Sequence, residues 1–476
     1  MKFTDIPSLG MPPGPLTVWR TSAAPGAVWT RDARPASHVQ EAHLTYALAT
    51  AGEGPPAPSW LGIAFDLPAG LDPDAFAAAL CAWTDRHENL RSRLLPPAAS
   101  GPPLRETLPA GATAVRGTEV GDFADGAELA RRIEELFDRE AGPVGWPGFV
   151  CATVARADAT TVHLAADHSL MDGYSVLLIP YEIHALYAAA LAAGKGAVSP
   201  LPPVASYLDF AAAERATVDA LTSEHEVVVQ WCRFLAETGG RLPEFPVPVN
   251  DVSGDPGAQP GGYLELLGPA AARAFDRVCR AGGGDAFSGV LACLARVGHE
   301  MTDEQAFSTM APFHTRTEPY GSSLGWYVGM APISFPLHAS DFFEDVLHSA
   351  VSGLEGVKEL ARVPVSRVTE LLGATLRDPF MISYMDLRLT PGAREWHGRR
   401  TVTLRGRSTD PDEVCFWFMR THEGLSVSYR HPATAAADIA VRHYVEHVRR
   451  LLEAVADTGR WPSDSLQEAQ PPAPVV

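Results

Sequence analysis

Hydrophobic and polar residues follow two periods along this chain, and both occur in each half. In residues 59–67 every second side chain is apolar, which is the period of a strand. Asp72 and Pro73 then have the residue types of a helix N-cap and first turn, so a helix is predicted to run from there to about Arg91. Its apolar stripe consists of Phe76, Leu80 and Trp83.

The same reasoning predicts the remaining elements. Paired strands are expected at 149–156 and 160–166, and a hairpin over 413–429 that turns at 422–424. Helices are expected at 125–140, 174–187, 286–301, 342–360 and 435–456. Residues 95–118 are rich in turn-forming types and predict no regular element.

Strands alternate with helices in both halves, which favours an α/β fold of two similar lobes. A Pro- and Gly-rich stretch predicts the connection between them. The predicted organisation is an N-terminal surface segment (1–37), an N-terminal lobe (38–195), a linker (196–208), a C-terminal lobe (209–459) and a frayed tail (460–476).

Composition and charge narrow the class of protein. The 476 residues are 46% hydrophobic and 20% charged, as in soluble globular proteins, and the net charge of −19 disfavours nucleic acid and anionic membranes as partners. The apolar run 174–193 contains Pro180, Glu182 and His184, so a buried helix is predicted rather than a membrane span. Scattered cysteines and a start without an apolar signal core predict a cytoplasmic protein.

The segment His168-Ser-Leu-Met-Asp172-Gly173 is the strongest candidate for chemistry. His168 follows a predicted strand, and an imidazole there can take a proton from a hydroxyl, amine or thiol near neutral pH. Asp172 could be a second catalytic group, or it could hold the turn through a buried ion pair, and Gly173 allows the backbone to fold closely behind the imidazole. These residues predict a general-base site.

Three other interpretations compete with this one. His168 could be a core histidine, or it could share a metal with His163, Asp167 and Asp172. Strand alternation places His163 and Asp167 on the face opposite His168, so no metal site is predicted. Residues 321–325 match the GxSxG pattern of serine hydrolases at Ser323, but polar residues precede them where a nucleophile elbow needs a strand.

The HxxxDG segment resembles the signature of condensation-domain and chloramphenicol-acetyltransferase-like acyltransferases. Arg86-His-Glu-Asn-Leu-Arg91 is similar to the RHExLR element of these proteins, and residues 312–317 with 325–332 are similar to an element of their second lobe. Residues 383–388 are similar to a segment of free-standing polyketide-associated acyltransferases. The resemblance covers roughly residues 38 to 458.

The resemblance implies a fold and roles for the site residues. Two acetyltransferase-like lobes, each a mixed sheet with flanking helices, would form a V-shaped pseudo-dimer around a central tunnel. His168 would be the base and Asp172 an anchor, with Arg91 as the matching buried arginine. Asp167 replaces the first histidine of many condensation domains, which favours stand-alone acyltransferases. Trp326 would support the tunnel near His168.

It also implies an activity. Such enzymes move an acyl group from a coenzyme A or carrier-protein phosphopantetheine thioester to a hydroxyl or amine, in natural-product or lipid biosynthesis. The thioester is a co-substrate, so no permanently bound cofactor is expected. An acyl or peptidyl carrier protein would need a local basic patch for docking. The alternatives are a non-catalytic platform for carrier proteins and a hydrolase acting through Ser323.

Overall fold

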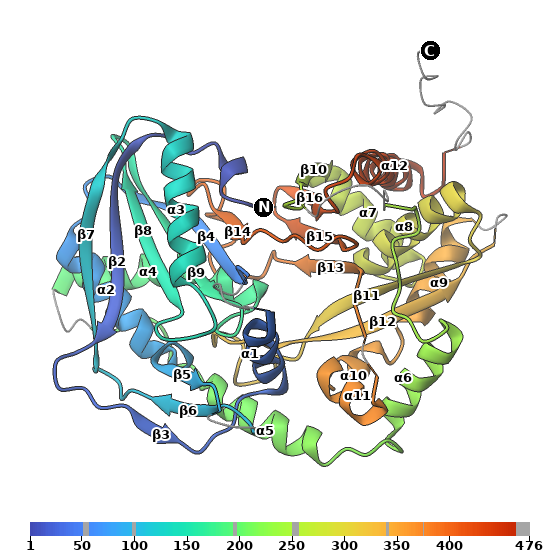
Figure 1. Ribbon diagram of the computed structural model, residues 1–476. Helices are drawn as coiled ribbons and strands as arrows, with labels where there is room; N and C mark the ends of the chain where they lie inside the picture. Colours follow the sequence, from blue (N-terminus) through green and yellow to red (C-terminus); the bar gives the residue numbers. More distant parts are fainter. Residues whose placement is uncertain are drawn as a thin grey trace.

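Two lobes, each built on its own large sheet, lie side by side in the protein (Figure 1). The computed structural model describes residues 1–50, 57–97, 101–193, 198–249, 257–338, 342–374 and 376–462. The two-lobed mixed α/β architecture confirms the predicted fold class.

The first lobe contains a seven-stranded sheet. All neighbouring strands in it are antiparallel except β1 and β14, which are parallel. In sheet order the strands are β1 (Phe3–Thr4), β14 (Val402–Arg405), β4 (Trp60–Pro68), β9 (Ala159–Asp167), β8 (Phe149–Ala155), β2 (Gly14–Ala23) and β7 (Thr113–Phe123).

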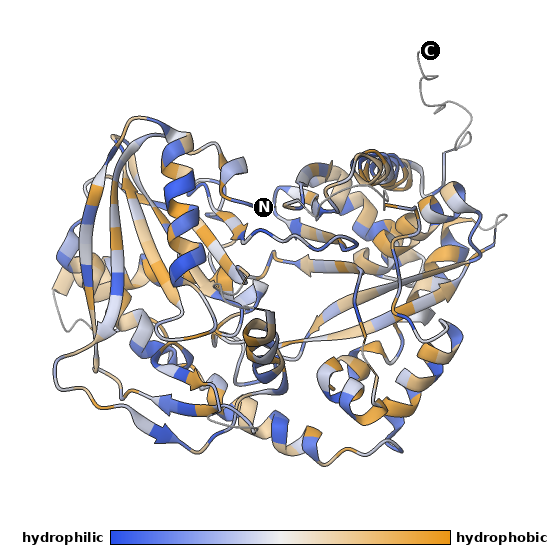
Figure 2. Cartoon of the chain, viewed as in Figure 1, coloured by the Kyte–Doolittle hydropathy of each residue, from blue (hydrophilic) through white to orange (hydrophobic). Residues whose placement is uncertain are grey.

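Helices cover both faces of this sheet. Helices α2 (Pro73–Arg86) and α4 (Gly173–Ala193) pack together on one face, and α3 (Gly126–Glu140) packs on the other. As predicted, α2 begins at Asp72, whose Oδ1 accepts a hydrogen bond of 2.9 Å from the Ala75 N–H, with Pro73 in the first turn. Helix α3 has an apolar side on the sheet and hydrophilic residues on its outer side (Figure 2).

The second lobe has the larger core. Its six strands, in sheet order, are β10 (Gly261–Leu267), β16 (Gly424–Arg430), β15 (Val414–Thr421), β13 (Phe380–Asp386), β11 (Ala306–His314) and β12 (Val328–Pro336). The helices in its core are α7 (Pro269–Ala281), α8 (Ala286–Thr302), α9 (Phe343–Leu354) and α12 (Ala435–Thr458). The predicted hairpin is formed by β15 and β16.

Smaller elements lie below and between the lobes. A three-stranded sheet has the order β3 (Thr30–Asp32), β6 (Leu104–Thr107) and β5 (Ser92–Leu95). Helix α1 (His38–Thr50) lies between the lobes in Figure 1. The other helices are α5 (Tyr207–Asp219), α6 (Glu226–Glu237), α10 (Val357–Ala361) and α11 (Val365–Leu372), and short 3-10 turns occur at Pro7–Leu9 and Glu88–Arg91.

The N-terminal part differs from the prediction. Residues 1–37 are not only a surface segment, because β2 lies within the first sheet between β8 and β7 and buries Leu16, Val18 and Trp19. Residues 95–118 are also not merely turns, because β7 forms the sheet edge there. Most β7 side chains are exposed, so this strand lacks the apolar alternation that reveals a strand in sequence.

Two predicted helices end early. The first stops at Arg86 because His87 adopts an extended conformation, and a 3-10 turn follows. The helix expected over 342–360 is divided into α9 and α10, since Glu355 is extended and Gly356 has a φ of 73°.

The chain crosses between the lobes near its C-terminal end. Strand β14, from the predicted C-terminal lobe, lies in the first sheet between β1 and β4. The lobe and linker boundaries given above remain a prediction, and most of the predicted tail lies outside the described residues.

Helix α4 is long and apolar enough to cross a bilayer by length and composition. In this structure 56% of its apolar window is buried, and it packs against α2 and β4. This is the environment of a core helix.

Candidate active site

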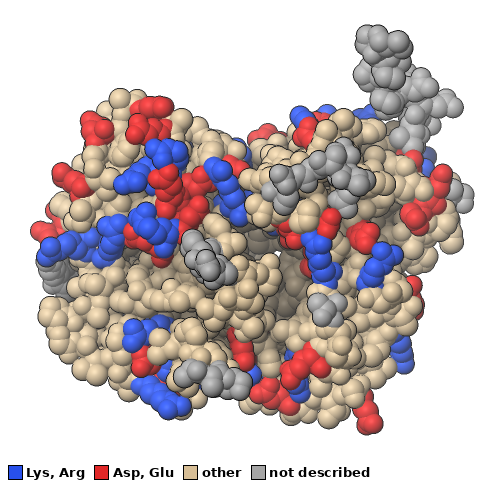
Figure 3. Space-filling model, in the orientation of Figure 1, with Lys and Arg blue, Asp and Glu red and all other residues tan. Residues whose placement is uncertain are grey.

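A cavity of about 1550 Å³ lies between the two lobes. Its wall includes residues of β4, the segment after β9, and strands β11, β12, β13 and β15 of the second sheet. Figure 3 shows the hollow between the two halves of the molecule. His168, Asp172, Gly173 and Trp326, which the sequence analysis selected from distant segments, all line this one cavity.

His168 is the residue that directly follows β9. Its N–H donates to the Ser59 carbonyl at 3.1 Å, which continues the pairing with β4. Its ring lies against Trp326, with 3.9 Å between the ring centroids. The Nδ1 atom is buried without a hydrogen-bond partner. Since the side chain lines the cavity, Nε2 is the ring nitrogen left open to a substrate.

The surroundings of His168 keep its ring neutral. Burial lowers the pKa of His168, and the electrostatic effect of His43 lowers it further. The neighbouring carboxylates Asp167 and Asp172 act in the opposite direction but do not outweigh these effects. An unprotonated imidazole at neutral pH is the form that a general base requires.

Asp172 is a buried anchor between the lobes. Its Oδ1 lies 3.0 Å from Arg316 Nη2 and accepts the Ser175 N–H at 2.7 Å, and its Oδ2 accepts the Tyr327 N–H at 3.0 Å. Burial alone would raise the pKa of Asp172, but Arg316 and these donors lower it. The carboxylate therefore ties the turn after His168 to the second lobe.

Asp167 and His43 form a second polar pair near His168 and Trp326. Asp167 is fully buried, and its Oδ2 lies 3.2 Å from His43 Nε2 on α1 and accepts the Ser59 hydroxyl at 2.5 Å. His43 also contacts the Trp326 ring edge-on, at 5.5 Å between centroids. Sequence reasoning missed His43, because a single histidine on an amphipathic helix has no motif around it.

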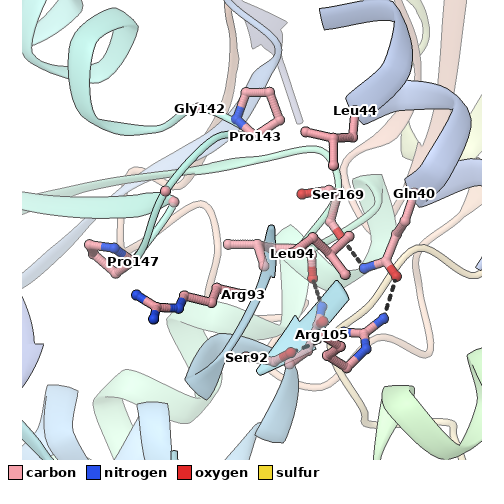
Figure 4. A pocket seen from close by; sticks show the side chains of 14 residues that line it. Gln40, Leu44, Ser92, Arg93, Leu94, Arg105, Gly142, Pro143, Pro147 and Ser169 are labelled. Carbon is pink, nitrogen blue, oxygen red and sulfur yellow. Dashed lines mark hydrogen bonds between the residues drawn. The ribbon is translucent and has the colours of Figure 1, made fainter. Parts of the chain in front are cut away.

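The main-chain turn after His168 is held from behind by polar side chains. Gln40 donates to the Ser169 carbonyl at 2.8 Å and in turn accepts from Arg105 Nη2 at 2.9 Å (Figure 4). Asn89 donates to the Leu170 carbonyl at 2.7 Å. The RHENLR segment thus supports the turn from which His168 projects.

The same segment also binds α4. Glu182, buried within this apolar helix, accepts from Arg86 Nε at 2.8 Å and lies 2.7 Å from His87 Nε2. A buried charge is costly unless it is paired and hydrogen-bonded, and the Glu182 carboxylate is both. These contacts fix α4, whose first turn borders the cavity.

A family profile described as the condensation domain matches residues 32–385 of this chain. The chain belongs to the condensation-domain family. Acyltransferase PapA3 of Mycobacterium tuberculosis is 28% identical over 337 residues, which cover 69% of this chain and 70% of PapA3. The 2'-acyl-2-O-sulfo-trehalose (hydroxy)phthioceranyltransferase PapA1 of the same species is 27% identical over 325 residues, which cover 66% of this chain and 61% of PapA1.

A solved structure agrees with these relatives. PapA2 acyl transferase superimposes with a TM-score of 0.86 at 24% identity, covering 96% of this chain and 100% of that chain. The predicted family resemblance is confirmed, and the condensation-domain protein described here is an acyltransferase.

One predicted contact of this condensation domain is wrong. Arg91 does not pair with Asp172; its Nη1 donates to the Leu108 carbonyl, and its Nε lies 4.0 Å from Asp85. The partner of Asp172 is Arg316, which comes from the second-lobe element. Arg91 was chosen because it ends a recognised motif, whereas Arg316 lies 144 residues away from Asp172 in sequence.

Gly173 also has a different role from the predicted one. A Cβ atom at this position would meet no atom within 4 Å, so no close backbone contact requires glycine there. Gly173 instead begins α4 and lines the cavity, where the missing side chain leaves room beside His168. In the described residues, no group of three or more His, Cys, Asp or Glu side chains could hold a metal ion.

The hydrolase interpretation is tested by Ser323→Ala. Ser323 is buried, its hydroxyl accepts from the Tyr327 hydroxyl at 2.8 Å, and it does not line the cavity. Because no base contacts this hydroxyl in the described structure, we expect the variant to keep its acyl-transfer rate. Fluorophosphonate probes should leave the wild-type protein unlabelled, as detected by intact-protein mass spectrometry. Stoichiometric labelling at Ser323 would contradict this expectation.

Proposed function

We propose that this acyltransferase moves an acyl group from a thioester, either acyl-coenzyme A or acyl-phosphopantetheine on a carrier protein, to a substrate hydroxyl, with His168 as the general base. The single observation that carries the proposal is the position of His168. Its Nδ1 is buried, its Nε2 is open, and it lines a cavity that both lobes enclose. Two substrates can meet there from different sides.

The proposed reaction is direct transfer. His168 Nε2 removes the proton from the acceptor hydroxyl as its oxygen attacks the thioester carbonyl carbon. The tetrahedral intermediate then collapses with cleavage of the carbon–sulfur bond, and the imidazolium returns the proton to the leaving thiolate. The products are an ester and a free thiol, and the enzyme is regenerated without an acylated residue.

The developing oxyanion needs hydrogen-bond donors. The first turn of α4 supplies candidates, because the N–H groups of Gly173 and Tyr174 have no hydrogen-bond acceptor in the described structure and both residues line the cavity. The partial positive charge of a helix N-terminus also favours an anion there. We assign oxyanion stabilisation to this turn.

The names of the relatives support a hydroxyl acceptor in lipid biosynthesis. PapA1 is named for transfer to a sulfated, acylated trehalose, a sugar whose acceptor groups are hydroxyls. We extend only this chemistry to the present protein, which we also place in the cytoplasm. The thioester is a co-substrate, and no resident cofactor takes part in the proposed steps.

Initial-rate kinetics test the proposal. If the acceptor attacks the thioester directly, both substrates must be bound together with the reacting atoms about 3–3.5 Å apart. Rates measured with S-acyl-coenzyme A and a hydroxyl acceptor at varied concentrations should give intersecting double-reciprocal lines. Mass spectrometry of enzyme incubated with the donor alone should detect no acylated protein.

The opposite pattern would reject direct transfer. Parallel lines, together with an acyl group trapped on the protein in the absence of acceptor, would show a covalent relay. His168 would then not be a simple base.

A further inference from the structure

A second buried cation lines the cavity at some distance from the base. Arg405 is the last residue of β14, and its side chain is only 4% exposed. It is paired with Leu61 of β4, which is in turn paired with Ala166 of β9. Neighbouring strands are about 4.8 Å apart, so the Arg405 backbone lies about 10 Å from Ala166, two residues before His168.

Among the described residues, the guanidinium of Arg405 has no hydrogen-bond acceptor. Its Nε is buried and unpaired, and the described part of the chain offers neither a hydrogen bond nor an ion pair to its Nη atoms. Burying an arginine costs free energy unless its donors are satisfied. An unsatisfied guanidinium on a cavity wall is therefore in position to bind something that enters the cavity.

Arg105 shows what a structural arginine looks like in the same protein. It is equally buried and forms no ion pair with a described carboxylate, but its donors reach the Gln40 amide and the Ser92 hydroxyl (Figure 4). They also reach the carbonyls of Arg34 and Pro35. These neutral acceptors satisfy it. Arg405 has no comparable neutral acceptors among the described residues. Its donors are therefore left unsatisfied, unlike those of Arg105.

Asp5 and Glu413 lie near enough to raise the pKa of Arg405, but neither forms an ion pair with it in the described structure. The nearest cation, Arg430, is paired with Glu413, and both arginines lie within 6 Å of the Trp417 ring centroid. Burial and then the Arg430 charge lower the pKa of Arg405 to about 10, so it is still charged at neutral pH. Burial and Glu413 raise the pKa of Asp378, one of several carboxyl groups that line the cavity, to about 7.

The neighbouring backbone makes room for this side chain. Gly261 begins β10, and a Cβ atom at that position would clash with Arg405 Nη2 and with the Tyr429 carbonyl. Any larger residue would force the guanidinium to move. Both Arg405 and Trp417 therefore keep defined positions on the cavity wall.

We propose that Arg405 binds a tetrahedral oxyanion, a sulfate or phosphate ester carried by one of the two substrates. A guanidinium donates two parallel hydrogen bonds to such a group, and this geometry suits it better than an ammonium. The inference rests on the proposed function in one respect, namely that the substrates meet in this cavity. It adds an anionic group as a recognised feature of a substrate.

The position of Arg405 favours the acceptor as the source of the anion. The first phosphate of coenzyme A or phosphopantetheine is separated from the thioester by the whole pantetheine arm, which is longer in its extended form than the 10 Å or so between Arg405 and the base region. That figure is the spacing of the Arg405 backbone from Ala166 across two strand pairs, and a sulfate or phosphate on a compact hydroxyl acceptor suits such a short separation better. The experiment below separates the two sources.

Binding of inorganic sulfate tests the site itself. Thermal unfolding of the full chain is followed while sodium sulfate replaces sodium chloride at constant ionic strength. A ligand that binds only the folded state stabilises it in a saturable way. We expect Arg405→Gln to weaken the apparent sulfate affinity by about 10-fold or more, the effect of losing hydrogen bonds to a charged group.

Arg407→Gln is the matched control. Arg407 lies two residues further along the chain and also lines the cavity, but its guanidinium is already paired with Glu134. The Arg407→Gln variant removes the same charge from the cavity wall. Because Arg407 is already paired with Glu134, this variant should leave sulfate stabilisation unchanged. Equal stabilisation of wild type and Arg405→Gln, or none in either, would overturn the proposal.

To identify which substrate carries the anion, ligands with and without the anionic group are compared. Affinities of wild type and Arg405→Gln are compared for octanoyl-coenzyme A against S-octanoyl-pantetheine, and for trehalose 2-sulfate against trehalose. A loss confined to trehalose 2-sulfate assigns the anion to the acceptor, and a loss confined to octanoyl-coenzyme A assigns it to the donor. Because His168→Ala should retain sulfate binding while losing transfer, failure of this proposal is distinguishable from failure of the proposed function.

Discussion

His168→Ala is expected to lower kcat by about 10²- to 10⁴-fold, the contribution of a general base, while the protein folds normally. The ring contributes no hydrogen bond through its side chain in the described structure, so little stability depends on it. Its contact with Trp326 is at the cavity surface, where water can replace the ring.

The measurement is single-turnover transfer at saturating donor, with circular dichroism and thermal unfolding as controls for the fold. His43→Gln is the matched variant, because it removes a second histidine that lines the cavity and contacts Trp326. We expect it to lose much less activity than His168→Ala. A well-folded His168→Ala protein with near-normal turnover would refute the role of His168.

The pH dependence of the wild-type rate follows from the same site. A base must be neutral to act, so activity should be lost as the pH falls through the pKa of His168. Because burial and His43 lower that pKa, the midpoint of the acidic limb should lie below the ordinary histidine value of about 6.5. This midpoint should be absent from the residual rate of His168→Ala.

Asp172→Asn should destabilise the protein by about 3–5 kcal/mol, because it leaves Arg316 as an uncompensated buried charge. Arg316→Met should lower the free energy of unfolding by a similar amount, because it leaves the Asp172 carboxylate buried without its partner. The double variant should be less destabilised than the sum of the two single variants, since neither charge is then left alone. Urea unfolding monitored by fluorescence measures these free energies.

The pH dependence of unfolding tests whether Asp172 stabilises the protein in its charged form. The pKa of Asp172 is lower in the folded state than its ordinary value of about 3.9, so its pairing contributes stability above that value and loses it as the pH falls. The stability difference between wild type and Asp172→Asn should therefore shrink in acid. A fully stable but inactive Asp172→Asn would instead indicate that Asp172 takes part directly in the chemistry.

The elements that sequence predicted well are those with a regular apolar pattern. Strand β4, helix α2 and helix α12 each bury a regular apolar pattern, and their bounds differ from the predicted ones by a few residues. Two of the elements missed lack this pattern: β7 is an exposed edge and β14 is only four residues long. Pairing partners, not their own side chains, make these segments strands.

In the site, too, residues within local motifs were predictable, whereas partners distant in sequence were not. His168, Asp172 and Trp326 were selected from local motifs, and the fold places all three on one cavity. The partner of Asp172 was not predictable in this way, because Arg316 reaches it only after the lobes have assembled. Arg405 was also missed, since an arginine without a carboxylate partner is recognisable only when its three-dimensional neighbours are known.

Strand β14 makes the two lobes topologically inseparable. It is supplied by the second half of the chain, yet its hydrogen bonds are made with β1 and β4 of the first sheet. A fragment that ended between the lobes would expose the backbone edge of β4, and exposed strand edges tend to pair with strands of other molecules. Expressing the halves separately should thus give aggregates.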